Sequence, residues 1–433
     1  MTRSTSLLLA ALCGWSVAGL AAQDRTVTLE EALELAERVQ PSLVQARGAI
    51  RSADASLKSN TGSFLPSLSV SASTSTNSSN RFNQATGQIV SSPSSSSYSG
   101  GIGLGLDLFE GFRRVNQRKA ANAVISAADA SLTNQEFQVA LLTKQSFFAA
   151  LAMQELVRVS ERRVERATRQ LTVSADKLRA GAATRSDSLR SRVELGSAQL
   201  ALLRAEADLA AAQANLGRQI GVGGRVAAAF DTTLLRPLAP LDVDALVAEA
   251  VGGAPRVVEA EANASAASAQ VSVARATYWP TLAASYSNGY SGFEAPWGSV
   301  SDYVNNWSFR LSLNWTIFNG FQREGQVVNA GVQRDNAVAS AADTRREVHA
   351  QVIRLTADLE SAWRQIEIAD ASLIAAQEDL RVQQQRYGVG AATIVELLTS
   401  QVALDEAEVE VVRARYDYVV ARAQLEALIG RTL

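Results

Sequence analysis

Apolar and polar residues alternate without a break in the segment 307–317, "WSFRLSLNWTI". Successive side chains of a β-strand project to opposite faces, so this segment predicts a strand with one apolar and one polar face. Three other stretches alternate in the same way, with mostly Ser and Gly at their polar positions. The four strands are predicted at about 66–76, 101–109, 281–291 and 306–318.

The length of these strands suggests what covers their apolar faces. A strand of about eleven residues reaches roughly 36 Å and, tilted by about 45°, crosses the ~25 Å apolar band of an outer membrane. We therefore interpret the apolar faces as lipid-facing, and the core of a soluble sheet is the alternative. The polar faces carry few charges, as the wall of a water-filled lumen would. Four aromatic residues are predicted to lie in membrane girdles: Tyr286, Tyr290, Trp307 and Trp315.

Four strands are too few to close a barrel in one chain. Open sheet edges are not tolerated in hydrocarbon, and the smallest bacterial barrels have about eight strands. Any barrel is therefore shared between chains: two copies give eight strands and three give twelve, and the strand pattern does not choose between them. The Ser-rich stretch 77–97 is predicted to be an exposed loop, with 292–305 as its shorter counterpart.

The chain contains two copies of one pattern. "LFEGF" at 108–112 recurs as "IFNGF" at 317–321, and "LRAGAAT" at 178–184 recurs as "YGVGAAT" at 387–393, with the same offset. Each copy has two shorter helices, two strands, a very long helix, a turn with glycine and a last helix. We predict the repeats at 28–221 and 242–430, a connector at 222–241, long helices at 112–178 and 321–386, and tip turns at 179–187 and 387–393.

The helices carry heptad repeats. In the last helix, apolar residues recur every seven positions: Leu397, Leu404, Val411, Tyr418 and Leu425. This spacing indicates coiled-coil packing. Each long helix spans roughly 100 Å at 1.5 Å per residue. A rod of that length has little interior, so we expect it to lie beside copies of itself.

The N-terminus is typical of an export signal. Arg3 is followed by the largely apolar segment Leu7–Leu20 and then by alanines, so we predict a signal peptide at 1–22, with a retained anchor as the alternative. Cys13 is the only cysteine. Removal of the signal leaves a chain without thiols, which suits an oxidising compartment.

Composition excludes several function classes. A formal net charge of −2 argues against a basic nucleic-acid surface. His349 is the only histidine, so a metal cluster or a nucleophile–base pair is not expected. The phosphate-loop pattern GxxxxGK[ST] is missing from the sequence. We predict no enzyme activity, no catalytic residue and no cofactor, and a passive duct whose driving force comes from a partner.

The double repeat and the segment "RYGVGAATIVELLTSQVALDEAEVEVVRARYDYVVARAQL" (386–425) resemble the TolC-like outer membrane efflux protein family. This resemblance implies a mainly α protein with membrane β structure. Its members are homotrimers with a 12-stranded β-barrel in the outer membrane and a 12-helix α-barrel through the periplasm. The implied partners are a periplasmic adaptor and an inner-membrane transporter, in small-molecule efflux or type I protein secretion.

The resemblance also assigns gate and docking residues. Tyr387 matches the family's tethering tyrosine, Asp187 its acidic partner and Glu396 the first acid of the entrance ring. Thr399 stands in place of the second acid and Ala392 in place of a tethering arginine. Glu396 also fits a plain helix-capping role, because a carboxylate is favoured in a first turn. The residues expected at the adaptor-docking tips are Gly181, Ala182, Thr184, Gly390, Ala391 and Thr393.

A second function class stays open on the residues alone. A periplasmic coiled-coil scaffold or adaptor with a soluble β-domain would show the same heptads. It would bury the apolar strand faces inside one chain, whereas an export channel exposes them to lipid.

Overall fold

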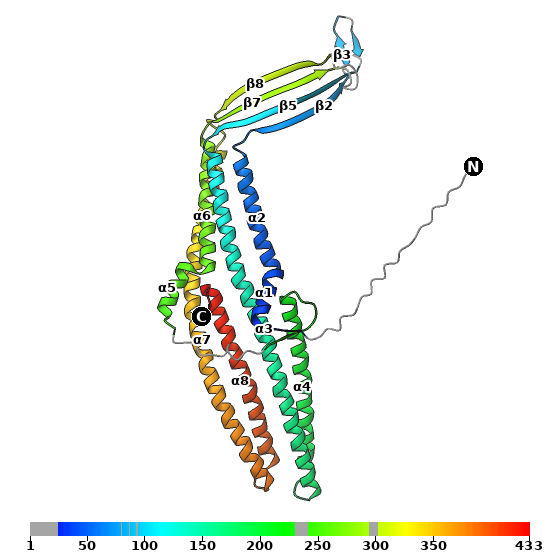
Figure 1. The fold of residues 1–433 in the computed structure, drawn as a ribbon, viewed down its shortest axis with the longest axis vertical. Helices are drawn as coiled ribbons and strands as arrows, with labels where there is room; N and C mark the ends of the chain where they lie inside the picture. Colours follow the sequence, from blue (N-terminus) through cyan, green and yellow to red (C-terminus); the bar gives the residue numbers. More distant parts are fainter. Residues whose placement is uncertain (1–24, 79, 86, 92–93, 230–240, 294–301) are drawn as a thin grey trace, which may run out of the picture. The chain divides into compact units, whose positions relative to one another are not determined.

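The computed structural model describes residues 25–433 except 79, 86, 92–93, 230–240 and 294–301 (Figure 1). The signal peptide predicted at 1–22 lies outside the described residues, as does much of the connector. The chain forms two compact units, each built from both repeats. Unit 1 comprises Met1–Val39, Leu142–Pro237 and Ser361–Val420. Unit 2 comprises Gln40–Leu141, Leu238–Glu360 and Ala421–Leu433.

Helices make up most of the described chain. They are α1 (Leu29–Val39), α2 (Pro41–Gly62), α3 (Arg113–Arg179), α4 (Arg185–Gln219), α5 (Val243–Gly253), α6 (Pro255–Arg275), α7 (Gln322–Gly388) and α8 (Ile394–Ile429). Prolines occupy the first turns of α2 and α6, where a missing N–H costs no hydrogen bond. Among the described helices, none combines the length and the apolar character needed to cross a membrane.

Four strands of unit 2 form an antiparallel sheet in the order β2-β5-β7-β8 (Figure 1). These strands are β2 (Ser67–Asn77), β5 (Ser95–Glu110), β7 (Thr281–Gly292) and β8 (Val304–Asn314). The pairing of β5 with β7 joins the two repeats. Two small pairs complete the described strands: β3 (Asn80–Asn83) with β4 (Gln88–Ser91), and β1 (Arg25–Val27) with β6 (Val226–Ala228).

The first hairpin is longer than its hydrophobic pattern predicts. β5 begins at Ser95 rather than near 101, and β3 and β4 lie in the stretch expected to be a plain loop. Hydroxyl groups pair across β2 and β5 in this part, with oxygen–oxygen distances of 2.8 Å for Ser73–Ser99 and 2.9 Å for Ser75–Ser97. Such cross-strand hydroxyl pairs stabilise the pairing of two strands even where the sequence has no alternating apolar residues.

The last strand is shorter than predicted. β8 ends at Asn314, opposite Thr281, instead of reaching 318. The residue before Thr281 is Pro280, which has no N–H to donate and so ends the ladder. The carbonyls of Thr316 and Ile317 instead accept hydrogen bonds from the guanidinium of Arg323, at 3.1 and 3.4 Å.

In unit 2, α6 is joined to both long helices. Asn134 of α3 donates to Glu259 at 2.6 Å, and Arg256 forms an ion pair of 2.9 Å with Glu347 of α7. At the start of α3, Arg114 donates to the carbonyl of Ser63, just after α2, at 3.0 Å. These contacts fix the helices that adjoin the sheet.

Unit 1 contains two helical hairpins, α3–α4 and α7–α8. The heptad positions predicted in α8 are buried: Leu397 is 0% exposed, Tyr418 1% and Leu404 5%. A second apolar cluster brings together β1, β6, α3, α4 and α8, with Phe147, Leu216 and Val226 at most 1% exposed. The sequence did not predict the β1–β6 pair, because strands of three residues give too short a pattern.

Candidate functional site

The four-stranded sheet has one apolar face, and that face is exposed. Strand register aligns Leu68, Leu104, Tyr286 and Phe309 in one row across all four strands. On this face Val70 is 77% exposed, Trp307 71% and Leu313 70%. A surface of contiguous large apolar side chains marks an interaction with lipid or protein.

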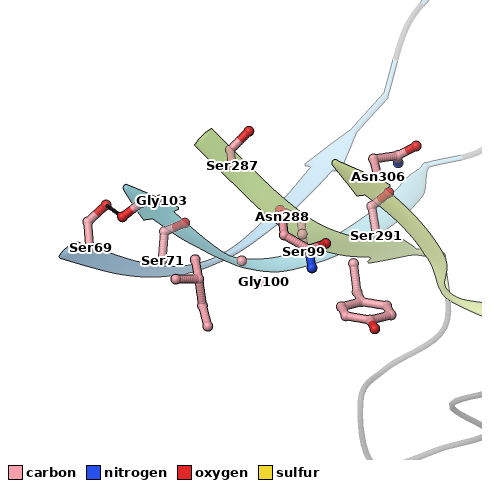
Figure 2. A pocket seen from close by; sticks show the side chains of 13 residues that line it. Ser69, Ser71, Ser99, Gly100, Gly103, Ser287, Asn288, Ser291 and Asn306 are labelled. Carbon is pink, nitrogen blue, oxygen red and sulfur yellow. Dashed lines mark hydrogen bonds between the residues drawn. The ribbon is translucent and has the colours of Figure 1, made fainter. Parts of the chain in front are cut away.

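The opposite face is polar. The neighbouring row is Ser69, Gly103, Ser287 and Ser308. The hydroxyls of Ser287 and Ser308 lie 2.9 Å apart. Figure 2 shows serines of β2, β5 and β7 beside the glycines of β5, at a shallow recess in the middle of the sheet. The predicted division into one apolar and one hydroxyl-bearing face is therefore present in the register.

Both outer strands of this sheet have an unpaired side. Among the described strands, β2 pairs only with β5, and β8 pairs only with β7. Unpaired strand edges present rows of backbone donors and acceptors, which make them templates for another strand.

The predicted girdle residues lie at different levels. Tyr286, Tyr290 and Trp307 belong to the apolar face of β7 and β8. Trp315 follows β8, is 60% exposed, and donates from its indole to the carbonyl of Tyr278 at 3.2 Å. Trp315 therefore lies where strand gives way to helix.

That junction contains further aromatic residues, which no hydrophobic pattern in the sequence predicts. Phe112 and Phe321 have positive φ angles of 66° and 64°, each directly after a glycine with positive φ. Their rings pack edge-on against Trp279 and Phe318, at centroid distances of 6.1 and 5.4 Å. A non-glycine residue in the left-handed conformation costs about 1–3 kcal/mol of conformational free energy, and such strained residues are often found at functional sites. The signal for this junction in the sequence is the repeated Gly-Phe of "LFEGF" and "IFNGF".

The two hairpin tips have the same backbone geometry. Gly181 and Gly390 have φ of 72° and 82°. The next residues, Ala182 and Ala391, each donate back to the helix, to Lys177 and Arg386, at 2.8 Å. This is a Schellman turn, in which the left-handed position favours glycine.

Each tip then starts its next helix in a matching way. Thr184 accepts from the N–H of Asp187 at 3.3 Å, and Thr393 accepts from the N–H of Glu396 at 3.2 Å. The carboxylate of Asp187 in turn accepts from the N–H of Thr184 at 2.9 Å, which completes a capping box. The predicted tip residues thus form two equivalent turns.

The structure does not join Tyr387 to Asp187. Within the described residues, the Tyr387 hydroxyl is buried and has no hydrogen-bond partner. Instead, the ammonium of Lys177, near the end of α3, lies 4.2 Å from the centre of the Tyr387 ring and donates to the Tyr387 carbonyl. Tyr387 is 6% exposed.

The predicted entrance residues lie at the start of α8. The Glu396 carboxylate accepts from the Thr393 hydroxyl at 3.2 Å and lies 3.9 Å from Arg386. The Thr399 hydroxyl donates to the carbonyl of Val395, within its own helix, at 2.9 Å. Glu396 thus lies in the first turn of α8, where a carboxylate is favoured, and its side chain is 48% exposed.

An ion cluster in unit 1 links α3 to α4 and α8. Arg166 contacts Asp405 at 2.6 Å and Glu408 at 2.7 Å, and Arg163 contacts Asp405 at 2.9 Å and Glu194 at 2.8 Å. Burial raises the pKa of Asp405, although both arginines act to lower it. No sequence pattern predicts this cluster, because its members lie far apart along the chain.

No group of three His, Cys, Asp or Glu side chains suited to a metal ion occurs in the described part of the chain. The features that stand out are a sheet with an exposed apolar face, a coiled-coil body and two capped tips.

Comparisons with known proteins agree with this geometry. The outer membrane efflux protein BepC of Brucella suis is 23% identical over 338 residues, which are 76% of this chain and 72% of BepC. Protein CyaE of Bordetella pertussis is 29% identical over 299 residues, which are 65% of this chain but only 61% of CyaE.

The fold is that of a solved channel structure. A crystal structure of CusC has a TM-score of 0.80 and 18% identity, and the match covers 93% of this chain and 92% of CusC. The model of the outer membrane efflux protein family matches residues 32–222 and 246–431, which are most of the chain. This family consists of passive channels in the outer membrane, so the comparison favours the channel over the periplasmic scaffold. The chain belongs to the outer membrane efflux protein family.

Proposed function

We propose that three copies of this chain form one channel-tunnel that carries substrates from an inner-membrane pump and a periplasmic adaptor across the periplasm and the outer membrane. In this assembly the sheets of three copies close a 12-stranded barrel. The helices of three copies, four from each, form the tunnel. The duct is passive, and the pump supplies the driving force.

The observation that carries this proposal is the four-stranded sheet itself. Its apolar face is exposed, with Val70 and Trp307 more than 70% accessible, and both of its edge strands are unpaired in the described chain. In hydrocarbon every backbone group must be satisfied, so β8 of one copy pairs with β2 of the next. Lipid then covers the apolar face, and the hydroxyl face lines the lumen.

The gate of the proposed tunnel lies at the tips. Lys177 joins the end of α3 to Tyr387 of α7, and we assign this contact the role of holding the two hairpins together in the closed state. Glu396 of three copies forms an acidic ring at the entrance, where focused negative charge attracts cations. The two equivalent turns around Gly181 and Gly390 are the surfaces offered to the adaptor.

Fractionation and reconstitution test the proposal. We expect the mature protein to stay in the membrane pellet after carbonate washing, to need detergent for solubility, and to have the mass of three chains by light scattering. In planar bilayers it should conduct ions. A detergent-free monomer that washes off membranes would contradict the channel and favour a soluble scaffold.

A further inference from the structure

The hydroxyl face of the sheet carries very few charges. Its positions on the four strands are mainly serine, glycine and asparagine, as in the row Ser69, Gly103, Ser287 and Ser308. Among the described residues of this face, the ionisable side chains are Asp107, Glu110 and Arg310. Glu110, at the end of β5, is only 9% exposed and forms an ion pair with Arg113. Asp107 and Arg310 are exposed, and no described residue forms an ion pair with either.

Register places the two charges close to one level. Arg310 lies in the row of Ser67, Gly105 and Ser285. Asp107 lies in the next row on this face, opposite Ala283, toward the end where β5 leads into α3. Two strand spacings of about 4.8 Å and one two-residue step of about 6.8 Å separate their backbones, roughly 12 Å in all.

The arrangement of these charges around a lumen rests on the proposed trimer. If β8 pairs with β2 of the next copy, the strand order β2-β5-β7-β8 repeats around the ring. Each Arg310 then has an Asp107 two strands away on either side, one from its own copy and one from its neighbour. Positive and negative groups alternate around the lumen.

We propose that Arg310 and Asp107 form a belt of alternating charge around the helix-side end of the barrel lumen, and that this belt determines the ion preference of the barrel. A wall of hydroxyls and glycines discriminates little between anions and cations. Fixed charges in a narrow, low-dielectric passage act on passing ions over about a Debye length, ~10 Å at 0.1 M salt. The belt is therefore the level at which the barrel distinguishes charged cargo.

The belt makes two predictions of opposite sign. Arg310→Gln leaves the carboxylates uncompensated and shifts the potassium-to-chloride permeability ratio toward potassium. Asp107→Asn leaves the guanidinium groups of Arg310 uncompensated and shifts the ratio toward chloride. We expect a change of at least about twofold in each case, and we expect the double variant to return close to the wild-type ratio. Ser312→Asn, on the same face two residues from Arg310, is the matched control and should leave the ratio unchanged.

The measurement is the reversal potential of single channels in planar bilayers under a potassium chloride gradient at low ionic strength. A second readout does not depend on the tips: Arg310→Cys should react with a charged, water-soluble thiol reagent added from the outer-surface side, whereas Leu311→Cys, on the apolar face, should not. Channels that conduct but keep one ratio in all variants, or an unreactive Arg310→Cys, would overturn the belt. Failure to form channels at all would instead contradict the proposed function.

Discussion

The ammonium group of Lys177 lies 4.2 Å from the centre of the Tyr387 ring and donates to the carbonyl of the same residue. This contact joins α3, from the first repeat, to α7, from the second. The tyrosine hydroxyl, by contrast, has no partner among the described residues. At the tips, the contact to Tyr387 from the other hairpin is therefore made by Lys177, a residue that the resemblance did not assign.

Replacing the lysine should loosen the tips. A cation–π contact and a hydrogen bond together contribute about 1–2 kcal/mol, a factor of about 5–30 in an equilibrium. We expect Lys177→Gln to raise the open fraction of single channels several-fold in planar bilayers. Arg179→Gln, two residues further along α3 and 79% exposed, is the control and should gate like wild type.

The tyrosine gives the complementary experiment. Tyr387→Phe keeps the ring and the carbonyl that Lys177 contacts and removes only a hydroxyl without a described partner. We expect its gating to match wild type, measured in the same bilayers. An open fraction as high as that of Lys177→Gln would show that the hydroxyl holds the gate.

Two arginines of α3, Arg166 in the ion cluster and Arg169 on the surface, should contribute unequally to stability. The Arg166 side chain is 14% exposed and contacts two acids, whereas Arg169 is 68% exposed and has one surface partner, Glu165. Removing one partner of a largely buried group costs about 3–5 kcal/mol, and a surface pair contributes about 0–1 kcal/mol. We expect Arg166→Gln to lower the unfolding temperature clearly and Arg169→Gln to leave it within error.

The acid in this cluster predicts a pH dependence. The folded pKa of Asp405 is raised by burial, so the folded state binds a proton more readily than the unfolded chain. Through Asp405, stability should therefore fall as the pH rises from the unfolded to the folded pKa. Asp405→Asn should remove this part of the dependence, measured by unfolding temperature across acidic pH. An unchanged slope would contradict the raised pKa.

Sequence patterns predicted the elements whose period is long and regular. The heptad of Leu397 and Leu404 and the alternation from Trp307 to Leu313 both correspond to what the structure shows. The ends of the strands were predicted less well. They depend on contacts with the neighbouring strand, such as the missing N–H of Pro280 and the serine pairs, and the hydrophobic pattern of a single strand does not contain this information.

The contact between Lys177 and Tyr387 could not be derived from the sequence alone. Lys177 and Tyr387 are more than two hundred positions apart, and a single lysine in a basic helix end carries no pattern. The same holds for Arg166 and Asp405. The aromatic residues at the strand-to-helix junction are a different case. Gly-Phe occurs at equivalent places in both repeats, so the sequence does contain a signal for their shared conformation.

The geometry of the second tip turn predicts that replacing two nearby glycines, Gly388 and Gly390, affects stability differently. Gly390 has φ +82°, which a side chain disfavours by about 1–2 kcal/mol. Gly388 ends α7, and a methyl group added there would meet no other atom within 4 Å. We expect Gly390→Ala to lower thermal stability and Gly388→Ala to leave it unchanged or raise it. Equal losses in both variants would contradict the left-handed turn.

The two faces of β8 should tolerate charge differently. Leu311 lies on the apolar face and Ser308 on the hydroxyl face. A lysine facing lipid costs about 2–4 kcal/mol near the bilayer midplane, and one in the lumen costs little. We expect Leu311→Lys to reduce the amount of protein assembled in the outer membrane and Ser308→Lys to leave it near wild type, measured by immunoblot of membrane fractions.

The pairing of β8 with β2 of a neighbouring copy is tested most directly by disulfide cross-linking. Ser71→Cys on β2 is combined in turn with Asn306→Cys, Ser308→Cys or Arg310→Cys on β8, and each single variant serves as its control. We expect at least one pair to give covalent dimers and trimers, and no larger species, under oxidising conditions in membranes. Monomers alone from every pair, or chains linked without limit, would contradict a barrel closed by three copies.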